Sequence, residues 1–385
     1  MSPLEGITIL DLSRILSGPY CTMTLADLGA KVIKIESPEG DDTRQWGPPF
    51  IQDESAYFLS VNRNKKSVVL NLKKDKDREI FLKLVESADV VVENFRPGTL
   101  DRLGIGYETL KSQNSKVILA SISGYGQTGP YAQKPGYDIL AQGMGGLMSV
   151  TGEPGRPPTK AGFSLADVGT GMWAGFGILA ALLERAKSGE GQWVDVSLLD
   201  TMVSWQTYLA SNYFASGKDP EPMGTEHPNI VPYQVFEASD GHFILAVANE
   251  GLWKKFTALM GVKALEDPKF MTNPDRVRNR VELISMLKDV FQQRSCADWM
   301  ELFESKSIPC GPVNKFSDIL NDPHLKEREM IIEKEHPVLG KFKMLGIPVK
   351  FSRTPGQISS LPPKLGEHTA QVLEELRYKF DEAVR

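Results

Sequence analysis

Short apolar runs alternate with helical patterns along the first half of this sequence, and this alternation limits the possible folds more than any other feature. Each run has the length of one buried strand and is followed by turn residues or by apolar residues at helical spacing. The runs that predict strands lie at residues 7–12, 31–35, 67–72, 90–92 and 116–122. Strands that alternate with helices favour a mostly parallel sheet with helices on both faces. We therefore expect an α/β protein with a Rossmann-like, three-layer domain.

The alternating strand and helix patterns end near residue 217. The 385 residues fit two domains of about 150 residues or more each. Before that point, residues 166–187 show the clearest helical pattern, and a strand is predicted at 192–198 and helix at 199–216. A stretch rich in proline follows, which is typical of a linker or surface loop. We expect three segments: residues 1–216 as the first part of a large Rossmann-like domain, 217–326 as a small α+β domain, and 327–385 as a return to the large domain.

The charge balance argues against a general nucleic-acid-binding protein. Lys and Arg number 44 and Asp and Glu 49, so the formal net charge is −5, whereas nucleic-acid binders usually carry excess positive charge.

The three cysteines form no CxxC pair and the five histidines lack metal-ligand spacing, so we expect no metal site. The longest uncharged stretches, residues 168–183 and 201–217, are short for a membrane span of roughly 20 residues. Without a secretory signal at the N-terminus, we expect a cytoplasmic protein with no membrane partner.

The letters GYGQTG at residues 124–129 match the dinucleotide-binding pattern GxGxxG and follow a predicted strand. In that motif a helix opens at the glycines, and its N-terminal amides meet the pyrophosphate. Here Pro130 and Pro135 interrupt any such helix, and no acidic residue closes a strand about 20 residues further on. We therefore disfavour a nicotinamide-dependent dehydrogenase and interpret the segment as a glycine-rich loop.

Asp167 stands at or near the start of the predicted helix 166–187, and two interpretations remain open. As a helix N-cap, its carboxylate would accept hydrogen bonds from the first-turn amides. As a nucleophile, its ionised carboxylate would be favoured by the positive end of the helix. The four glycines between residues 169 and 177 would admit either a large ligand or a closely packed sheet.

Several stretches, in one order and nearly from end to end, resemble the class III coenzyme A transferases, the family of formyl-CoA transferase and carnitine CoA-transferase. The most specific are VENFRPG at residues 92–98 and the glycine-rich helix that follows Asp167. Others are DLSRILSGPY, GYDILAQGMGG, IPCGPV and LGEHT. Within the family, GDDTRQWGPPF and GTEHPNIVPYQVF are most similar to dicarboxylate CoA-transferases of the succinate–hydroxymethylglutarate type.

The resemblance implies that Asp167 is the nucleophile of a CoA-transferase. Its carboxylate would attack the donor thioester, and the reaction would pass through an aspartyl anhydride and an aspartyl-CoA thioester. Acyl-CoA is itself the substrate in this scheme, so neither a metal nor a tightly bound cofactor is expected. Amide donors in the glycine-rich surroundings of Asp167 would stabilise the tetrahedral oxygen.

The resemblance also implies which residues bind the two substrates. The implied CoA contacts are Ile15, Leu16, Leu70, Lys73, Asn94, Phe95 and Arg102, of which the lysine and the arginine suit phosphate. Tyr57 and Tyr137 fall near the small acid, where each hydroxyl could donate to a carboxylate or each ring could simply pack in the core. His227 lies in the loop that replaces a glycine-rich flap of formyl-CoA transferase, either as an ordinary loop residue or as a substrate contact.

The sequence departs from formyl-CoA transferase at two positions that bear on specificity. Leu16 stands where that enzyme has a glutamine, and Ser37 stands where it has an arginine. The first difference argues against the oxalate specificity of that enzyme. The second implies that another cation, Lys34, Arg14 or Arg44, helps to hold the nucleotide.

Two other functions remain as alternatives. The 2-methylacyl-CoA racemases share the implied fold, but their catalytic histidine aligns with Tyr137, and a tyrosine cannot replace a near-neutral base. A CoA-binding protein without turnover would have no need of an intact Asp167. The family fold further implies a homodimer of two interlocked rings, whose monomer has little independent stability.

Overall fold

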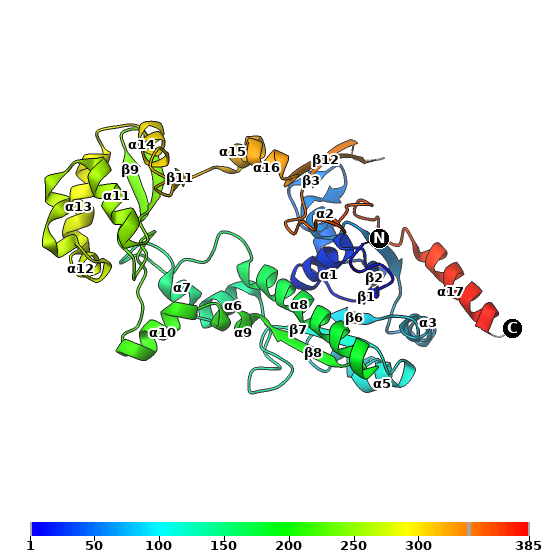
Figure 1. The fold of residues 1–385 in the computed structure, drawn as a ribbon. Helices are drawn as coiled ribbons and strands as arrows, with labels where there is room; N and C mark the ends of the chain where they lie inside the picture. The colour runs from blue at the N-terminus through cyan, green and yellow to red at the C-terminus, as the bar shows by residue number, and fades with distance from the viewer. Residues whose placement is uncertain (1, 337–339, 384–385) are drawn as a thin grey trace. The chain divides into compact units, whose positions relative to one another are not determined.

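The computed structural model describes residues 2–336 and 340–383, and the chain divides into two compact units (Figure 1). The first unit contains Met1–Leu147, Lys160–Ser211 and His324–Arg385, and the second contains Met148–Thr159 and Asn212–Pro323. Each unit is organised around its own buried hydrophobic side chains.

A six-stranded parallel sheet is the centre of the first unit. Its strands are β1 (Thr8–Asp11), β2 (Lys31–Glu36), β5 (Lys65–Val69), β6 (Val90–Glu93), β7 (Ile118–Ser123) and β8 (Trp193–Ser197). They lie in the order β5-β2-β1-β6-β7-β8, and every neighbouring pair is parallel. This is the strand order of a Rossmann fold, so the expected α/β, Rossmann-like architecture is confirmed. The order reverses between β1 and β6, and in such sheets ligands bind outside the carboxyl ends of the strands at that point.

Alternate residues of the strands face opposite layers of helices, as the period of two in a strand requires. On β6, Val90 and Val92 pack with α1 (Ser17–Asp27) and α8 (Leu165–Ser188). Val91 points the other way and packs with α3 (Asp75–Val85), α5 (Tyr107–Gln113) and α17 (Thr369–Ala383). All three valines are fully buried, and each contributes roughly 1.5–3 kcal/mol through burial of its side chain.

The long helix α8 packs directly on α1 through a glycine. A Cβ atom at Gly171 would lie 2.5 Å from the carbonyl oxygen of Ser17, so only glycine allows the two backbones to come this close. The helix ends at Gly189, whose φ of 82° is the left-handed C-cap conformation. By length and composition α8 is the one helix among the described residues that could cross a membrane, but buried core helices pass the same test.

The second unit is built on a three-stranded antiparallel sheet of β9 (Tyr233–Ala238), β10 (Gly241–Ala246) and β11 (Cys310–Pro312). The helices α11 (Glu250–Met260), α13 (Arg280–Phe291) and α14 (Cys296–Glu304) pack on it. Aromatic rings dominate this core, for example Phe243 and Phe291, whose ring centroids lie 5.2 Å apart.

One predicted helix is interrupted in the structure. The helical stretch expected at 199–216 is divided into α9 (Leu198–Ser204) and α10 (Thr207–Ser216), because Thr207 has a left-handed φ of 36°. The remaining elements are η1 (Asp42–Gln45), β3 (Phe50–Ile51), β4 (Glu54–Ser55), α2 (Ala56–Val61), α4 (Thr99–Arg102), α6 (Asp138–Met144), α7 (Leu147–Val150), η2 (Lys263–Glu266), η3 (Pro268–Phe270), α12 (Asn273–Arg278), α15 (Phe316–Asn321), α16 (Pro323–Glu327), β12 (Ile331–His336) and β13 (Gly340–Leu345).

Candidate active site

One asparagine joins the turn after β1 to the turn after β6. The Asn94 side chain accepts a hydrogen bond from the Arg14 N–H at 2.8 Å and donates one to the Arg14 carbonyl oxygen at 2.7 Å. Glu93, buried at the end of β6, accepts the Phe95 N–H at 2.8 Å. Both backbones are therefore held in place where the strand order reverses.

Ile15 has a left-handed φ of 69°, which is rare for a β-branched residue. The two carboxylate oxygens of Asp41 lie 3.2 and 3.3 Å from the Ile15 N–H and accept its hydrogen bond. Asp41 also forms an ion pair of 2.9 Å with Lys34, and both side chains are at most 1% exposed. Burial alone would raise the pKa of Asp41, but the Lys34 charge together with hydrogen bonds from Thr43 and Lys34 lowers it to about 2. A buried ion pair thus holds a strained turn, and strained residues cluster at binding sites.

A pocket of about 450 Å³ opens at the carboxyl ends of β1, β2, β5 and β6. Three of the predicted CoA contacts line it: Leu70, Lys73 and Phe95. Arg102 adjoins the pocket, since it donates at 2.8 Å to the hydroxyl of Thr99, another lining residue. The structure therefore brings these predicted contacts to one place at the switch point of the sheet.

Three cations were predicted as alternatives to take the place of the arginine that Ser37 replaces: Lys34, Arg14 and Arg44. Of these, Arg14 alone lines this pocket with an exposed side chain. Lys34 is enclosed with Asp41. Arg44 contacts Glu36 with two nitrogens at 2.8 and 2.7 Å. The Arg14 guanidinium pairs with Asp42 at 3.1 Å, with both side chains about half exposed. Exposed pairs of this kind are weak, so a phosphate could displace the carboxylate.

Asp167 lies in the first turn of α8 and is half-buried. The N-cap position belongs to Ser164, whose side chain makes no capping hydrogen bond. The interpretation of Asp167 as the N-cap of this helix is therefore wrong. The Ser17 hydroxyl, at the start of α1, acts on the Asp167 carboxylate and lowers its pKa.

The surroundings of Asp167 favour its protonated form. Burial, with a smaller contribution from the Asp138 carboxylate, raises the pKa of Asp167 to about 7, against the hydrogen bond with Ser17, which lowers it. Tyr57 faces the same carboxylates: burial first, then Asp167 and Asp138, raise the pKa of its phenol to about 12. Tyr57 therefore stays protonated at neutral pH and is able to donate a hydrogen bond.

An apolar cluster supplies part of this burial. Leu16 is 9% exposed and packs in one cluster with Tyr57 and with Val168, the residue after Asp167. The other members are Ile15, Tyr20, Met23 and Val61. A leucine in place of glutamine adds no hydrogen-bond donor beside the carboxylate, which agrees with the raised pKa of Asp167.

The first-turn amides of α8 are already hydrogen-bonded. Asp138 accepts the N–H groups of Ala166 at 2.8 Å and of Asp167 at 3.3 Å. The Leu165 and Val168 N–H groups donate to the carbonyl oxygens of Phe163 and Ser164. These four N–H groups each have an intramolecular acceptor, and the expectation that amides of the glycine-rich surroundings of Asp167 stabilise a tetrahedral oxygen stays a prediction.

Two further predicted residues are Tyr137 and His227. Tyr137 precedes Asp138 at the start of α6, and its side chain is 64% exposed. His227 belongs to the second unit, where its Nδ1 accepts the Asn229 N–H at 3.1 Å. Burial and the Arg280 charge lower the pKa of His227. The roles of both residues stay predictions.

Two residues beside Asp167 were missed by reasoning from the sequence, Ser17 and Asp138. Each directly follows a residue that was selected, Leu16 and Tyr137. The available signal was the GYD triplet at residues 136–138: its tyrosine aligns with the catalytic histidine of the racemases, and Asp138 is the next residue.

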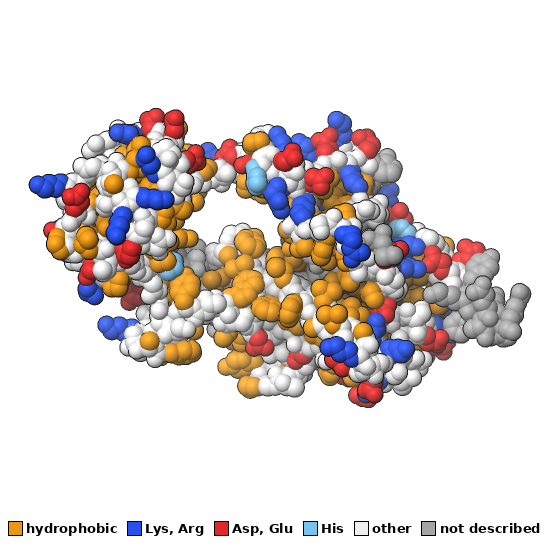
Figure 2. Space-filling model, in the orientation of Figure 1, with side chains coloured by type: hydrophobic (Ala, Val, Ile, Leu, Met, Phe, Trp, Pro, Cys, Tyr) orange, Lys and Arg blue, Asp and Glu red, His pale blue; other side chains and the backbone are white. Residues whose placement is uncertain are grey.

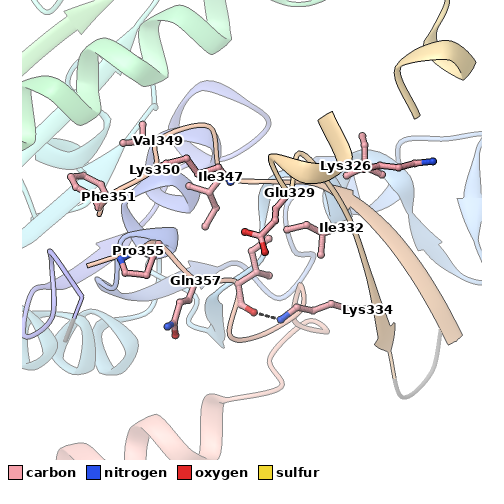
Figure 3. Close-up of a pocket in the computed structure, with 13 residues that line it drawn as sticks. Lys326, Glu329, Ile332, Lys334, Ile347, Val349, Lys350, Phe351, Pro355 and Gln357 are labelled. Carbon is pink, nitrogen blue, oxygen red and sulfur yellow. Dashed lines mark hydrogen bonds between the residues drawn. The ribbon is translucent and has the colours of Figure 1, made fainter. Parts of the chain in front are cut away.

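A larger pocket of about 600 Å³ lies in the C-terminal segment of the first unit (Figure 3). Lysines and apolar side chains line it, among them Lys334, which donates to the carbonyl oxygen of Ile358. None of the predicted site residues lines this pocket, so its size does not make it the active site. Among the described residues, no group of three or more His, Cys, Asp or Glu side chains could hold a metal ion.

The chain is similar to known proteins over nearly its whole length. The profile of CoA-transferase family III matches residues 4–369. Succinyl-CoA:glutarate CoA-transferase of Homo sapiens is 41% identical over 386 residues, covering 100% of this chain and 88% of the human protein. Succinyl-CoA:mesaconate CoA-transferase of Haloarcula hispanica is 40% identical, covering 97% of this chain and 96% of its own. The crystal structure of a CaiB/BaiF family protein from Brucella suis is 44% identical with a TM-score of 0.86, covering 97% of this chain and 99% of that one.

Proposed function

Because the chain belongs to CoA-transferase family III, we propose that it moves CoA from succinyl-CoA or a similar donor to a small dicarboxylic acid, with Asp167 as the nucleophile. The observation that carries the proposal is the half-buried Asp167 carboxylate with a pKa of about 7, beside Ser17 and Tyr57. The relatives named for glutarate and mesaconate support a dicarboxylic acceptor.

The proposed reaction keeps the acyl and thioester groups activated throughout. The ionised Asp167 oxygen attacks the donor carbonyl carbon, the C–S bond breaks, and CoA leaves as thiolate from an aspartyl–acyl anhydride. The thiolate then attacks the aspartyl carbonyl carbon, which releases the donor acid as carboxylate and leaves an aspartyl-CoA thioester. The acceptor carboxylate reverses these two steps, so no proton is gained or lost overall.

The raised pKa of Asp167 suits this role. A more basic carboxylate is a stronger nucleophile, and near pH 7 a large fraction of it is still ionised. The protonated Tyr57 hydroxyl supplies a hydrogen-bond donor for the carboxylate of the free acid. The pocket of about 450 Å³ offers Lys73 for the CoA phosphates and the Phe95 ring for the adenine.

We also propose that the active form is a homodimer. Large apolar side chains of α8 are exposed: Met172, Trp173, Phe176 and Leu183. Figure 2 shows hydrophobic side chains gathered on the visible face of the first unit. Monomeric proteins rarely expose a large continuous apolar patch, so a second copy of the chain is the expected occupant. Light scattering should give a mass near twice that of one 42.6 kDa chain; a mass near that of one chain would contradict the dimer.

Intact-protein mass spectrometry tests the reaction. Wild type, Asp167→Asn and Asp167→Ala are incubated with succinyl-CoA, treated with hydroxylamine or borohydride, and digested. We expect a CoA adduct or its trapped product on the peptide that contains Asp167, in wild type alone. A wild type without adduct that exchanges deuterium at the α-carbon of a 2-methylacyl-CoA would be an isomerase instead.

A screen of acceptors then tests the substrate class. Succinyl-CoA and acetyl-CoA are offered with glutarate, mesaconate, oxalate and carnitine, and the product thioesters are separated by chromatography. We expect turnover with glutarate or mesaconate. Turnover with carnitine alone would contradict the dicarboxylate assignment while leaving the nucleophile in place.

A further inference from the structure

The N-terminus of α8 is capped by a residue from another helix. Oδ1 of Asp138, the first residue of α6, accepts the Ala166 N–H at 2.8 Å and the Asp167 N–H at 3.3 Å. Its other oxygen accepts the Gln142 side-chain amide at 2.6 Å. The residue at the N-cap position, Ser164, makes no capping hydrogen bond. The position of the first turn of α8, and with it the Asp167 backbone, therefore depends on Asp138.

This cap brings a second carboxylate beside Asp167. An uncharged N-cap such as serine would satisfy the same amides without adding charge. Other polar groups that act on this site are Ser17 from α1, which lowers the pKa of Asp167, and Tyr57 from α2. The charges of Asp167, Asp138 and Asp41 raise the pKa of Tyr57, and Ser164 lowers it. A carboxylate in the role of cap thus has an electrostatic consequence that a hydroxyl would not have.

We propose that Asp138 is a positioning residue for Asp167: it anchors the first turn of α8 and places a negative charge beside the nucleophile. The inference rests on the proposed function for its catalytic meaning, but the electrostatic effect exists whether or not the chain transfers CoA. Two neighbouring carboxylates cannot ionise as easily as one, and the charge of Asp138 adds to burial in raising the pKa of Asp167. Asp138 would thereby make Asp167 a stronger nucleophile near neutral pH.

The variant Asp138→Asn separates charge from geometry. Its side-chain oxygen can still accept the two amides of α8, but the negative charge is lost. Melting temperatures are measured from pH 4 to 9 with Asp167 and with Asp167→Asn, in both the Asp138 and the Asp138→Asn backgrounds. In each background, the difference in melting temperature between the protein with Asp167 and the protein with Asp167→Asn depends on the ionisation of Asp167. This measurement needs no catalysis. We expect the pH at which this difference levels off to fall by about 1 unit in the Asp138→Asn background.

Catalysis supplies a second readout. The acid limb of the pH profile for adduct formation on Asp167 should move to lower pH by about the same 1 unit in Asp138→Asn, with a several-fold slower rate above that limb. Asp138→Ala should show the same shift and a lower melting temperature, because it also loses the cap. Asn249→Ala, which removes the side-chain cap of α11, is the matched control and should lower the melting temperature without moving the limb.

The outcomes distinguish the two proposals. If wild type forms no adduct but the melting-temperature difference shifts, the CoA-transfer mechanism fails and the effect of Asp138 on Asp167 stands. If adduct forms and neither the limb nor the levelling pH moves in Asp138→Asn, Asp138 is only a structural cap and the inference is overturned.

Discussion

The Lys34 ammonium and the Asp41 carboxylate lie 2.9 Å apart in an environment that excludes almost all solvent. Asp41 also accepts the N–H of Ile15 in its left-handed turn. Asp41→Asn should therefore leave the Lys34 charge without its ion-pair partner and weaken the hold on the turn. We expect a loss of roughly 3–5 kcal/mol in the free energy of unfolding, measured by urea denaturation, and at least a tenfold weaker affinity for CoA.

The neighbouring Asp42 provides the control for that substitution. It pairs with Arg14 at 3.1 Å, but both side chains are about half exposed, so Asp42→Asn should cost less than about 1 kcal/mol. Equal losses for the two variants would mean that the buried pair has no special part in stability.

The ionisation of Asp167 should make the stability of the protein depend on pH. Its folded-state pKa of about 7 lies above the ordinary value of 3.8, so the folded state binds more protons than the unfolded state between these values. Stability attributable to this residue therefore falls as pH rises from about 4 to 7, and the loss is complete above 7. Asp167→Asn removes this cost and should raise the free energy of unfolding at pH 8 by as much as about 4 kcal/mol.

Urea denaturation of wild type and Asp167→Asn at pH 4 and pH 8 measures this effect. The two proteins should differ least at pH 4 and most at pH 8, with the variant the more stable. A variant that is less stable than wild type at both values would show that the carboxylate is stabilising, contrary to the raised pKa.

The sequence predicted the parallel sheet well because its signals are local. Runs such as residues 90–92 are buried on both faces, so they are continuously apolar, and β6 appears there as Val90–Glu93. The interruption at Thr207 could not be predicted, since threonine does not favour the positive φ that it adopts there. Likewise, no pattern marks Met148–Thr159 as part of the second unit.

The side chains of the candidate site were likewise predicted only in part from the sequence. Asp167 was selected from the sequence, and three of the implied CoA contacts do line one pocket. The link between Asp138 and the amides of α8 spans 28 positions in sequence, so spacing could not reveal it. The ion pairs of Lys34 with Asp41 and of Arg44 with Glu36 also depend on which residues the sheet brings together. Because both cations already have carboxylate partners, Arg14 is left of the three cations considered for the nucleotide.

Two glycines of α8 should respond oppositely to alanine. A Cβ at Gly171 would lie 2.5 Å from the carbonyl oxygen of Ser17, whereas at Gly175 the nearest atom would be the Cys21 sulfur at 3.9 Å. Gly171→Ala must push α1 away and should lose about 1–3 kcal/mol. Because Ser17 also acts on the Asp167 carboxylate, activity should fall as well.

Gly175→Ala is the matched control in the same helix. Its Cβ would make only an ordinary van der Waals contact with Cys21, and alanine gains helix propensity, so the variant should be neutral or more stable by up to about 1 kcal/mol. Thermal unfolding of the two variants in parallel measures the contrast. If both gained stability, the contact between α8 and α1 would be looser than the structure has it.

Arg14 should carry the phosphate contact that an arginine at position 37 would otherwise make. It is exposed at the pocket of about 450 Å³, and its guanidinium lies 5.8 Å from the centroid of the Phe95 ring. Arg14→Met should weaken CoA binding about 10-fold or more, since a charge-assisted hydrogen bond to phosphate contributes about 1.5–3 kcal/mol. Calorimetry with CoA and with 3′-dephospho-CoA identifies the phosphate: a contact with the 3′-phosphate makes the variant and wild type bind the dephosphorylated ligand alike. Arg353→Met, which removes another exposed arginine outside this pocket, should leave both affinities unchanged, and an Arg14→Met variant that behaves like it would exclude Arg14 from the nucleotide site.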